Sequence, residues 1–187
     1  MRIIVGISGA SGVVLGQQML AALRIQPDME IHLVISDHAK QTLALESALP
    51  LSALTALADK VHDDHNQGSA IASGSFHTDG MIIIPCSMKT VAAIVTGYSD
   101  NLLVRAADVC LKEHRKLVLC PREMPLSRIH LRNLSQAADF GCIIIPPMLT
   151  MYNQADTLQK QMDHIIGKIL HQFDLNSPNF VPWQGRD

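Results

Sequence analysis

Backbone amides at two strand-to-helix turns are the groups in this sequence best suited to bind a small anion. An apolar strand-like run, residues 3–7, leads into the glycine- and serine-rich segment 8–12. Such a turn leaves the first N–H groups of the next helix without partners inside the helix, and the helix dipole favours a negative group beside them. Residues 86–90 repeat this order of strand, polar turn and helix. A phosphorylated small molecule is the expected ligand.

The spacing of the glycines narrows the choice of ligand. Gly6, Gly9 and Gly12 are three positions apart, so the dinucleotide pattern G-x-G-x-x-G is not present. Gly12 is followed by two valines, which excludes the Walker pattern. Asp37 could hold a ribose hydroxyl in an NAD site, although it suits a polar turn equally well. A mononucleotide such as FMN fits better, with a plain tight turn as the alternative.

Composition predicts one domain, residues 1–187, ending in a helix and a short tail from residue 174. The chain has 48% hydrophobic but only 17% charged residues, which indicates surface buried between subunits. A net charge of −2 without a basic run argues against nucleic acid as a partner. No apolar stretch reaches the roughly 20 residues that span a bilayer. With no signal-peptide pattern at the start, we expect a cytoplasmic protein.

Neither cysteines nor histidines predict a metal site. The four cysteines lie far apart in apolar settings, which favours buried free thiols. The run His62-Asp63-Asp64-His65 has ligand-type side chains, but adjacent residues rarely converge on one ion. We expect a solvated loop there, within a polar segment covering residues 59–76.

Apolar runs alternate with helical patterns along the whole chain, as in a parallel sheet covered on both faces. The last helix has the clearest pattern, with Asp156 as its expected N-cap and Gln159 completing a capping box. Ligands of such sheets bind beyond the carboxyl ends of the strands. The predicted strands cover residues 2–8, 30–35, 80–85, 116–120 and 142–146. The predicted helices cover residues 11–23, 37–46, 89–96, 101–114, 126–140 and 157–173.

Five stretches of this chain form a specific combination of motifs. They are Gly-Ile-Ser-Gly-Ala-Ser-Gly at 6–12, residues 69–76 around a Ser-Gly-Ser, Pro-Cys-Ser-Met-Lys-Thr at 85–90, residues 101–115, and residues 117–125 with Pro-Arg-Glu-Met-Pro. Together they closely resemble the flavin prenyltransferase family, whose members include proteins long labelled aromatic-acid or phenylacrylic-acid decarboxylases. The resemblance covers nearly the whole chain.

The resemblance implies a fold and an activity. The fold is a flavodoxin-like (Rossmann-like) α/β structure, a doubly wound parallel sheet in three αβα layers that binds FMN. The activity joins a dimethylallyl group from dimethylallyl monophosphate to N5 and C6 of the flavin. The prenylated FMN then serves a partner decarboxylase of aromatic or unsaturated acids. The family also implies a homo-oligomer, often a dodecamer, with sites at subunit contacts.

The resemblance also implies roles for residues that match by position. FMN contacts are expected from Gly9, Ala10, Ser11, Ser36, Ser87, Met88, Lys89, Thr90 and Arg122. Contacts to the prenyl phosphate are expected from Tyr152, Lys168, Lys112 and Arg122. Glu46 and Glu123 match carboxylates at the reaction site, and Ser11 matches a residue near flavin N5, so the expected catalytic residues are Glu123, Glu46, Ser11 and Lys112.

Several of these residues also have plainer explanations. Lys112 shares a helix face with Arg105 and Asp108, a pattern typical of an exposed face with salt bridges. Arg122 and Glu123 follow a buried strand, where a structural ion pair is nearly as good an interpretation as a crevice lining. A tyrosine in a proline-rich loop, as at position 152, is ordinarily a packing residue.

Two residues depart from what their position favours. Glu46 ends a predicted helix, where the dipole gives a carboxylate no help, so another reason for it is expected. Lys168 stands where the family commonly has arginine, and lysine keeps the charge but not the bidentate fork. We therefore expect weaker donor binding rather than lost chemistry.

The chemistry requires neutralisation of a departing phosphate, which Lys, Arg and a Tyr hydroxyl can supply. The sequence has no paired Asp-rich motif of the kind that holds a diphosphate through Mg²⁺, which favours a monophosphate donor and a metal-free site. Glu123 could move a proton to the phosphate or from the flavin adduct.

Other functions remain open at this point. The protein could be an FMN-dependent hydroxybenzoate or phenylacrylate decarboxylase, or a non-catalytic subunit of one. A flavin electron carrier is less favoured, because such carriers are strongly acidic and aromatic-rich, whereas this chain is near neutral with 4% aromatic residues.

Overall fold

The computed structural model describes residues 1–185, which form two compact units. The first is Met1–Pro146 and the second begins at Pro147. The prediction of one domain over the whole chain stays a prediction. Within the described residues, every helix is too short or too polar to cross a membrane.

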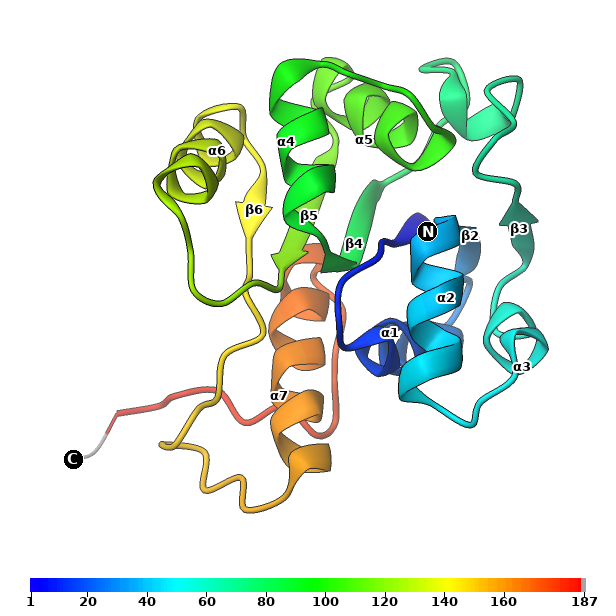
Figure 1. Ribbon diagram of the computed structural model, residues 1–187. Coiled ribbons are helices and arrows are strands. Elements are labelled where there is room, and N and C mark those ends of the chain that lie inside the picture. The colour runs from blue at the N-terminus through cyan, green and yellow to red at the C-terminus, as the bar shows by residue number, and fades with distance from the viewer. Residues whose placement is uncertain (186–187) are drawn as a thin grey trace. The chain divides into compact units, whose positions relative to one another are not determined.

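The first unit is built on one parallel sheet of six strands in the order β3-β2-β1-β4-β5-β6 (Figure 1). The order reverses between β1 and β4, and in doubly wound sheets ligands bind beyond the strand ends at this switch point. The strands are β1 (Arg2–Ile7), β2 (Glu30–Ile35), β3 (Lys60–His62), β4 (Gly80–Cys86), β5 (Lys116–Pro121) and β6 (Ile143–Ile144).

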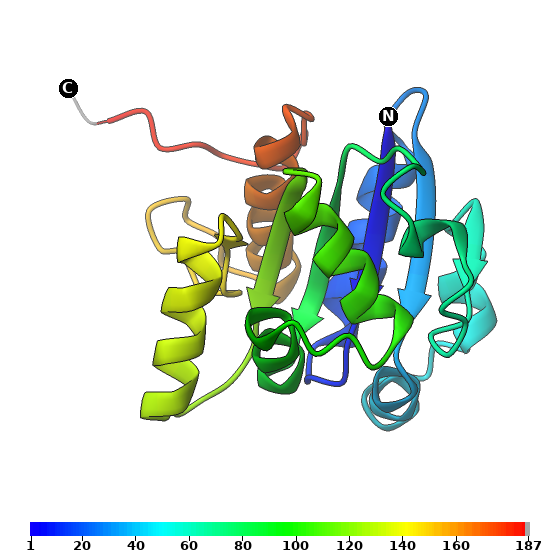
Figure 2. The same ribbon diagram turned by 90° about the horizontal axis from the view of Figure 1, so that it is seen from above.

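Helices cover both faces of this sheet because its central strands are apolar on both sides. All seven residues of β4 are buried, for example. Helix α1 packs against β1, β2 and β4, whereas α5 packs against β2, β4 and β5. Figure 2 shows α1 and α5 on opposite sides of the sheet, which confirms the doubly wound, three-layer fold. The helices of this unit are α1 (Val13–Arg24), α2 (Asp37–Glu46), α3 (Leu51–Thr55), α4 (Met88–Thr96), α5 (Leu102–Lys112) and α6 (Arg128–Asp139).

The segment predicted as a polar loop, residues 59–76, contains structure that the sequence did not reveal. Strand β3 is an edge strand of three residues, two of them exposed, too short to show an alternating pattern. A 3₁₀ turn at Ala70–Ala72 buries Ile71. The short helix α3, which precedes this segment, was also not predicted. Strand β6 is shorter than expected, with two residues rather than five.

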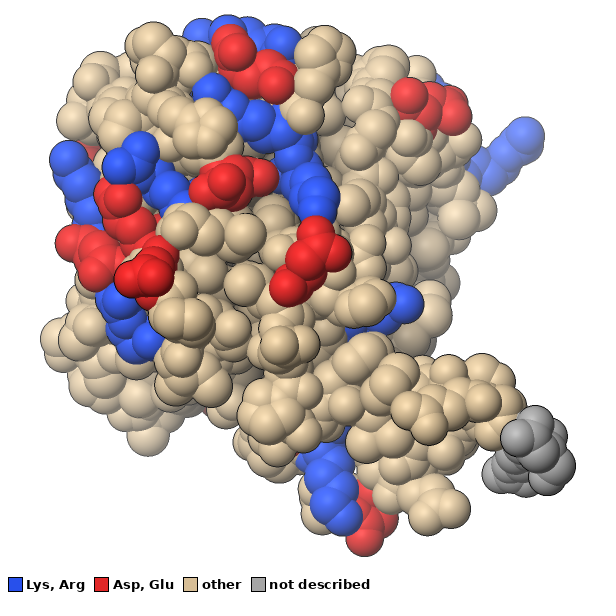
Figure 3. Space-filling model, turned by 180° about the vertical axis from the view of Figure 1, so that it is seen from behind, with Lys and Arg blue, Asp and Glu red and all other residues tan. Residues whose placement is uncertain are grey.

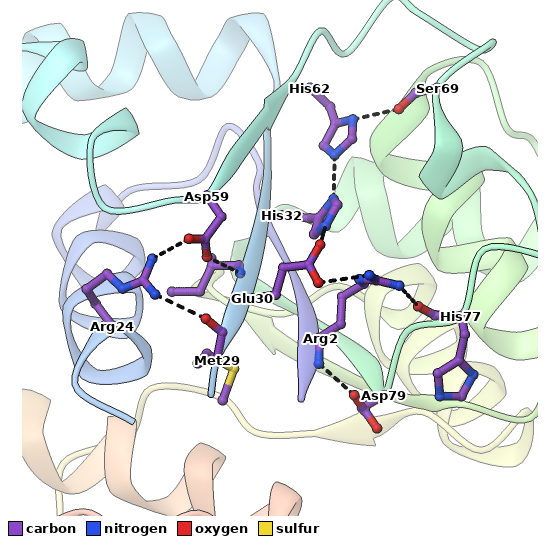
Figure 4. A network of polar contacts seen from close by, with 11 residues as sticks. Arg2, Arg24, Met29, Glu30, His32, Asp59, His62, Ser69, His77 and Asp79 are labelled. Carbon is purple, nitrogen blue, oxygen red and sulfur yellow. Dashed lines mark hydrogen bonds and ion pairs between the residues drawn. The ribbon is translucent and has the colours of Figure 1, made fainter. Parts of the chain in front are cut away.

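The prediction of a solvated loop at residues 62–65 is wrong for two of its four residues, since His62 and Asp64 are both buried. His62 Nε2 lies 2.8 Å from His32 Nδ1, and His62 Nδ1 lies 2.6 Å from Ser69 Oγ. His32 Nε2 is in turn 2.8 Å from a Glu30 carboxylate oxygen, so a chain of polar contacts crosses from the edge strand into the sheet (Figure 4). These contacts give hydrogen-bond partners to two buried imidazoles, which would destabilise the fold if they had only apolar neighbours.

Because of this histidine pair, we expect the folded protein to lose stability in weak acid. Burial, followed by the nearby His32 and Lys60, lowers the pKa of His62 to about 4. Because the unfolded chain takes up this proton at higher pH than the folded one, stability falls as the pH drops from about 6.5 towards 4, by up to about 3 kcal/mol. We expect the free energy of unfolding, measured by urea titration at each pH in this range, to change less steeply with pH in His62→Gln than in wild type. His77→Gln, at an exposed histidine, should keep the wild-type dependence of stability on pH. If both variants show the same pH dependence, His62 is not the source of the loss of stability in acid.

The second unit is organised around α7 (Leu158–Leu170) and a 3₁₀ turn, His171–Phe173. The predicted N-cap of α7, Asp156, is wrong by one residue, since the N-cap is Thr157. The Thr157 side chain accepts from the Lys160 N–H at 3.2 Å, while Asp156 forms an ion pair with the Lys160 ammonium at 2.7 Å. Along this helix and the turn after it, Met162, Ile165, Ile166, Ile169 and Phe173 are buried, whereas Leu158 is exposed.

Charged side chains are sparse on the surface. On the face shown in Figure 3, uncharged residues cover most of the area, and many of the blue and red groups adjoin one another. Many of the charged side chains form ion pairs, such as Arg24 with Asp59 at 2.8 Å.

Candidate functional site

A cavity of about 380 Å³ lies at the carboxyl edge of the sheet in the first unit. Its lining comes from the segments that follow β1, β2, β3 and β4, together with the start of α5. The structure brings five of the predicted FMN residues together here, namely Gly9, Ser36, Ser87, Lys89 and Thr90. Residues of this lining that were not predicted as ligand contacts are Asp37, His38, Asp64, His65, Ala93, Asp100, Asn101 and Val104.

Two of these residues, Asp64 and His65, share a simple signal. Asp64 and His65 directly follow β3, so recognition of that short strand would have placed them at the ligand edge. The Asp64 carboxylate accepts from the Leu103 N–H at 2.9 Å and from the Asn101 amide at 2.9 Å, which ties this loop to the start of α5. His65 Nε2 lies 2.7 Å from the Asp37 carboxylate, and this contact raises the pKa of His65.

Two helix N-termini converge on the cavity with hydroxyl groups at each. Ser36 caps α2 by accepting from the Ala39 N–H at 3.2 Å, and Ser87 caps α4 by accepting from the Thr90 N–H at 3.2 Å. A capping hydroxyl uses its oxygen as the acceptor and keeps its O–H for another partner. Ser87 Oγ also lies 3.0 Å from Thr90 Oγ1, so one of these two hydroxyls donates to the other and the second keeps its O–H. With the Lys89 ammonium beside them, these groups suit a phosphate.

Gly9 is required by the close approach of two segments. A Cβ at this position would overlap the Cβ of His38 in α2. We therefore expect Gly9→Ala to displace the start of α2 and to weaken FMN binding at least tenfold, because Ser36 and Asp37 move with it. Fluorescence titration with FMN measures this. Gly97→Ala is a contrasting control, since it has open space around it but a positive φ of 69°, and it should cost stability without changing the affinity for FMN.

The first turn is less open than the sequence predicted. The Glu46 carboxylate accepts from the N–H groups of Gly12 at 2.8 Å and Val13 at 3.4 Å, so two donors at the start of α1 already bind an anion of the chain itself. The Ala10 N–H donates to the Ser8 carbonyl. The Ser8 hydroxyl is also used, since it donates to the Pro85 carbonyl at 3.1 Å and accepts from the Ser87 N–H at 2.7 Å.

Glu46, Ser11 and Arg122 come together at the start of α1. Burial raises the pKa of Glu46, but hydrogen bonds from Ser11, Gly12 and Val13 and the charge of Arg122 outweigh it and lower the pKa overall. The carboxylate at the unfavourable end of α2 is thus stabilised by the favourable end of α1. The start of α1 therefore explains why a carboxylate is tolerated at position 46, where the dipole of α2 does not favour one.

Two predicted catalytic residues are not brought to these groups within the chain. Glu123 is exposed, and its carboxylate accepts from the adjacent Met124 N–H at 3.0 Å. Lys112 ends α5, and Val104 near the other end of this helix lines the cavity, so about 12 Å of helix separates Lys112 from that site. It forms an ion pair with Glu113, and the expected salt bridge on this helix joins Arg105 and Asp108 at 2.6 Å. Met88, predicted to contact FMN, is buried in the core.

In the second unit, His164 interacts with two of the four residues predicted to bind the prenyl phosphate, Tyr152 and Lys168. The Tyr152 hydroxyl lies 3.3 Å from His164 Nε2, and the charge of Lys168 acts on the same imidazole. Trp183 packs edge-on against Tyr152 with ring centroids 5.4 Å apart. The tyrosine is therefore held by other side chains rather than pointing freely into solvent.

Comparison with known proteins gives consistent matches. A family model described as Flavoprotein matches residues 1–173. The probable UbiX-like flavin prenyltransferase of Sedimentibacter hydroxybenzoicus is 58% identical over 99% of this chain and 98% of its own length. The flavin prenyltransferase LpdB of Lactiplantibacillus plantarum is 50% identical over 98% of each chain.

Two solved structures are similar throughout. One is a dodecameric FMN-dependent UbiX-like decarboxylase from Escherichia coli O157:H7, with a TM-score of 0.96 and 50% identity over 99% of this chain and all of the other. The second is AnUbiX (PadA1) in complex with FMN and dimethylallyl pyrophosphate, with a TM-score of 0.96 and 45% identity over 100% of this chain and 98% of the other.

Proposed function

Because the chain belongs to the flavoprotein family and, within it, to the UbiX-like flavin prenyltransferases, we propose that it joins a dimethylallyl group to N5 and C6 of reduced FMN. The observation that carries the FMN part is the cavity at the switch point, where two capped helix N-termini and Lys89 face one space. The product serves a partner decarboxylase of aromatic or unsaturated acids in the cytoplasm.

The phosphate end of FMN is proposed to bind in this cavity. The Ser36 hydroxyl, one O–H of the Ser87 and Thr90 hydroxyl pair, and the Lys89 ammonium supply donors and positive charge. Reduced flavin brings the nucleophilic nitrogen and carbon to the reaction, while the chain supplies binding, orientation and charge. Ser11 and Glu46, next to the cavity-lining turn at Gly9, are proposed to contact the reacting end of the ring.

Departure of the donor phosphate requires positive charge at its oxygens. Arg122 follows β5 directly, and its N–H donates to the Cys86 carbonyl at the end of β4, so it lies at the ligand edge of the sheet. We assign it, with Lys112, Tyr152 and Lys168, to the donor phosphate. Glu123, exposed to the same solvent edge, is proposed to transfer a proton to that phosphate or from the flavin adduct.

Lys112 is proposed to act in the site of a neighbouring copy of the chain. Its distance along α5 from the cavity supports this, as does the dodecameric relative. Exposed apolar side chains on and near α6 offer surface for such contacts, with Met124 85%, Ile129 61% and Leu131 54% exposed. An oligomer would therefore complete the site.

Mass spectrometry of the extracted flavin tests the reaction. The protein is incubated anaerobically with reduced FMN and either dimethylallyl monophosphate or the diphosphate. We expect a mass gain of one prenyl unit with the monophosphate and much slower product formation with the diphosphate, the compound present in the AnUbiX complex. Unchanged FMN with both donors would overturn the proposal.

A decarboxylase is the second candidate, because two similar structures carry that name. They are the E. coli protein and a phenylacrylic acid decarboxylase from Aquifex aeolicus, which is 31% identical with a TM-score of 0.84. Release of CO₂ from cinnamic or 4-hydroxybenzoic acid by the pure protein, without added prenyl donor, would favour it.

A further inference from the structure

His164 is a buried titratable residue to which the proposed function gives no role. It lies on α7 and is only 7% exposed. Its ring stands edge-on to Tyr152 at 5.6 Å between centroids and lies 5.0 Å from the ring of Phe180. Nε2 is 3.3 Å from the Tyr152 hydroxyl oxygen, whereas Nδ1 is buried and has no hydrogen-bond partner among the described residues.

The charge state of His164 follows from its surroundings. Burial, and then the positive charge of Lys168, lower its pKa, so the ring is neutral at physiological pH. A neutral imidazole carries one N–H donor and one acceptor nitrogen. The contact with Tyr152 can therefore run in either direction, depending on which nitrogen carries the hydrogen.

The partnerless Nδ1 decides between the two tautomers. A hydrogen on Nδ1 would leave a buried N–H donor without an acceptor, an arrangement that folded proteins rarely keep. A hydrogen on Nε2 leaves Nδ1 as an unfilled acceptor and lets Nε2–H donate to the Tyr152 oxygen. The Tyr152 O–H is then not consumed by the histidine.

We propose that His164 is a positioning residue that donates to the Tyr152 oxygen and so directs the Tyr152 O–H towards the phosphate of the prenyl donor. This rests on the proposed function, in which Tyr152 and Lys168 contact that phosphate. A tyrosine that donated to histidine would offer the phosphate only lone pairs, which repel it. With the histidine as the donor, the phenol is left as a donor aimed at an anion.

The packing around the ring supports this fixed orientation. Phe180 lies directly on α7 at Gly167, where any Cβ would overlap its side chain. The glycine thereby lets Phe180 reach the His164 ring. Trp183 packs against Tyr152 as well, so both partners of the hydrogen bond are held by aromatic contacts.

A double-mutant cycle on the FMN-loaded protein tests the assignment. Binding of dimethylallyl monophosphate is measured by calorimetry for wild type, Tyr152→Phe, His164→Phe and the double variant. We expect each single variant to weaken donor binding about tenfold, and the second substitution to add less than twofold. His164→Gln, whose amide can donate, should recover most of the affinity. His77→Phe, an exposed histidine of the first unit, should leave it unchanged.

The outcomes separate this inference from the reaction itself. Additive losses, or a normal donor affinity in His164→Phe or Tyr152→Phe, would overturn the positioning role even if prenylated flavin forms. Non-additive losses without any prenylated product would support the positioning role and overturn the proposed reaction. Unaltered FMN affinity in all variants shows that the first unit is still folded.

Discussion

Glu46→Gln is expected to slow prenyl transfer by about 10²-fold, the cost typical of removing one preorganised charge contact from a reaction site. The carboxylate lies against Ser11 and the Gly12 N–H and feels the charge of Arg122. Glutamine keeps an oxygen for the Gly12 N–H, so α1 stays capped while the negative charge is lost. Single-turnover formation of prenylated flavin measures the change.

Two controls show whether the charge matters for the reaction or only for the helix. Asp156→Asn removes an exposed carboxylate from an ion pair in the second unit and should not change the rate. A urea titration of Glu46→Gln should show a stability close to wild type, since the cap is retained. A near-normal transfer rate would mean that Glu46 only caps α1. Glu123 would then be the carboxylate that takes part in the reaction.

Lys112→Ala and Arg122→Ala should each lower the transfer rate by about 10²-fold or more, yet a mixture of the two inactive proteins should regain activity. If Lys112 acts in a neighbour's site, a mixed oligomer contains sites in which Arg122 comes from one copy and Lys112 from another. After denaturation and joint refolding of equal amounts, about a quarter of the sites would be intact. Product formation by the mixture, compared with each variant refolded alone, measures this.

The result of mixing is informative in both directions. Recovered activity places Lys112 and Arg122 in the same site but on different chains, in agreement with the length of α5 between Lys112 and the cavity. If the mixture stays as inactive as its components, the neighbouring-copy role for Lys112 is wrong. Arg105→Ala, which breaks an ion pair on the same helix, controls for general damage to α5.

The parallel sheet and its ligand edge could be predicted from the sequence because their signals are local. The central strands are continuous apolar runs, and the polar turns after β1, β2 and β4 directly follow them in the chain. The turns that contain Gly9, Ser36 and Ser87 are therefore predictable as neighbours at one edge of the sheet, and all three residues line the cavity. Strand β3 gave no such signal, since three residues at a sheet edge are too few to form a pattern.

Contacts between distant segments could not be predicted in this way. Glu46 is 34 positions from Gly12, and only the packing of α2 beside α1 brings its charge to the start of the other helix. The sequence predicts His62 to be part of a solvated loop, but the pairing of β3 with β2 brings it against His32. The sequence by itself determined which strands are buried and where polar turns end them, because backbone propensity and apolar periodicity act over a few residues. Only the tertiary structure decided which charges are neutralised, which amides are already occupied and which histidine meets Tyr152, since those energies depend on neighbours that are far apart in the chain.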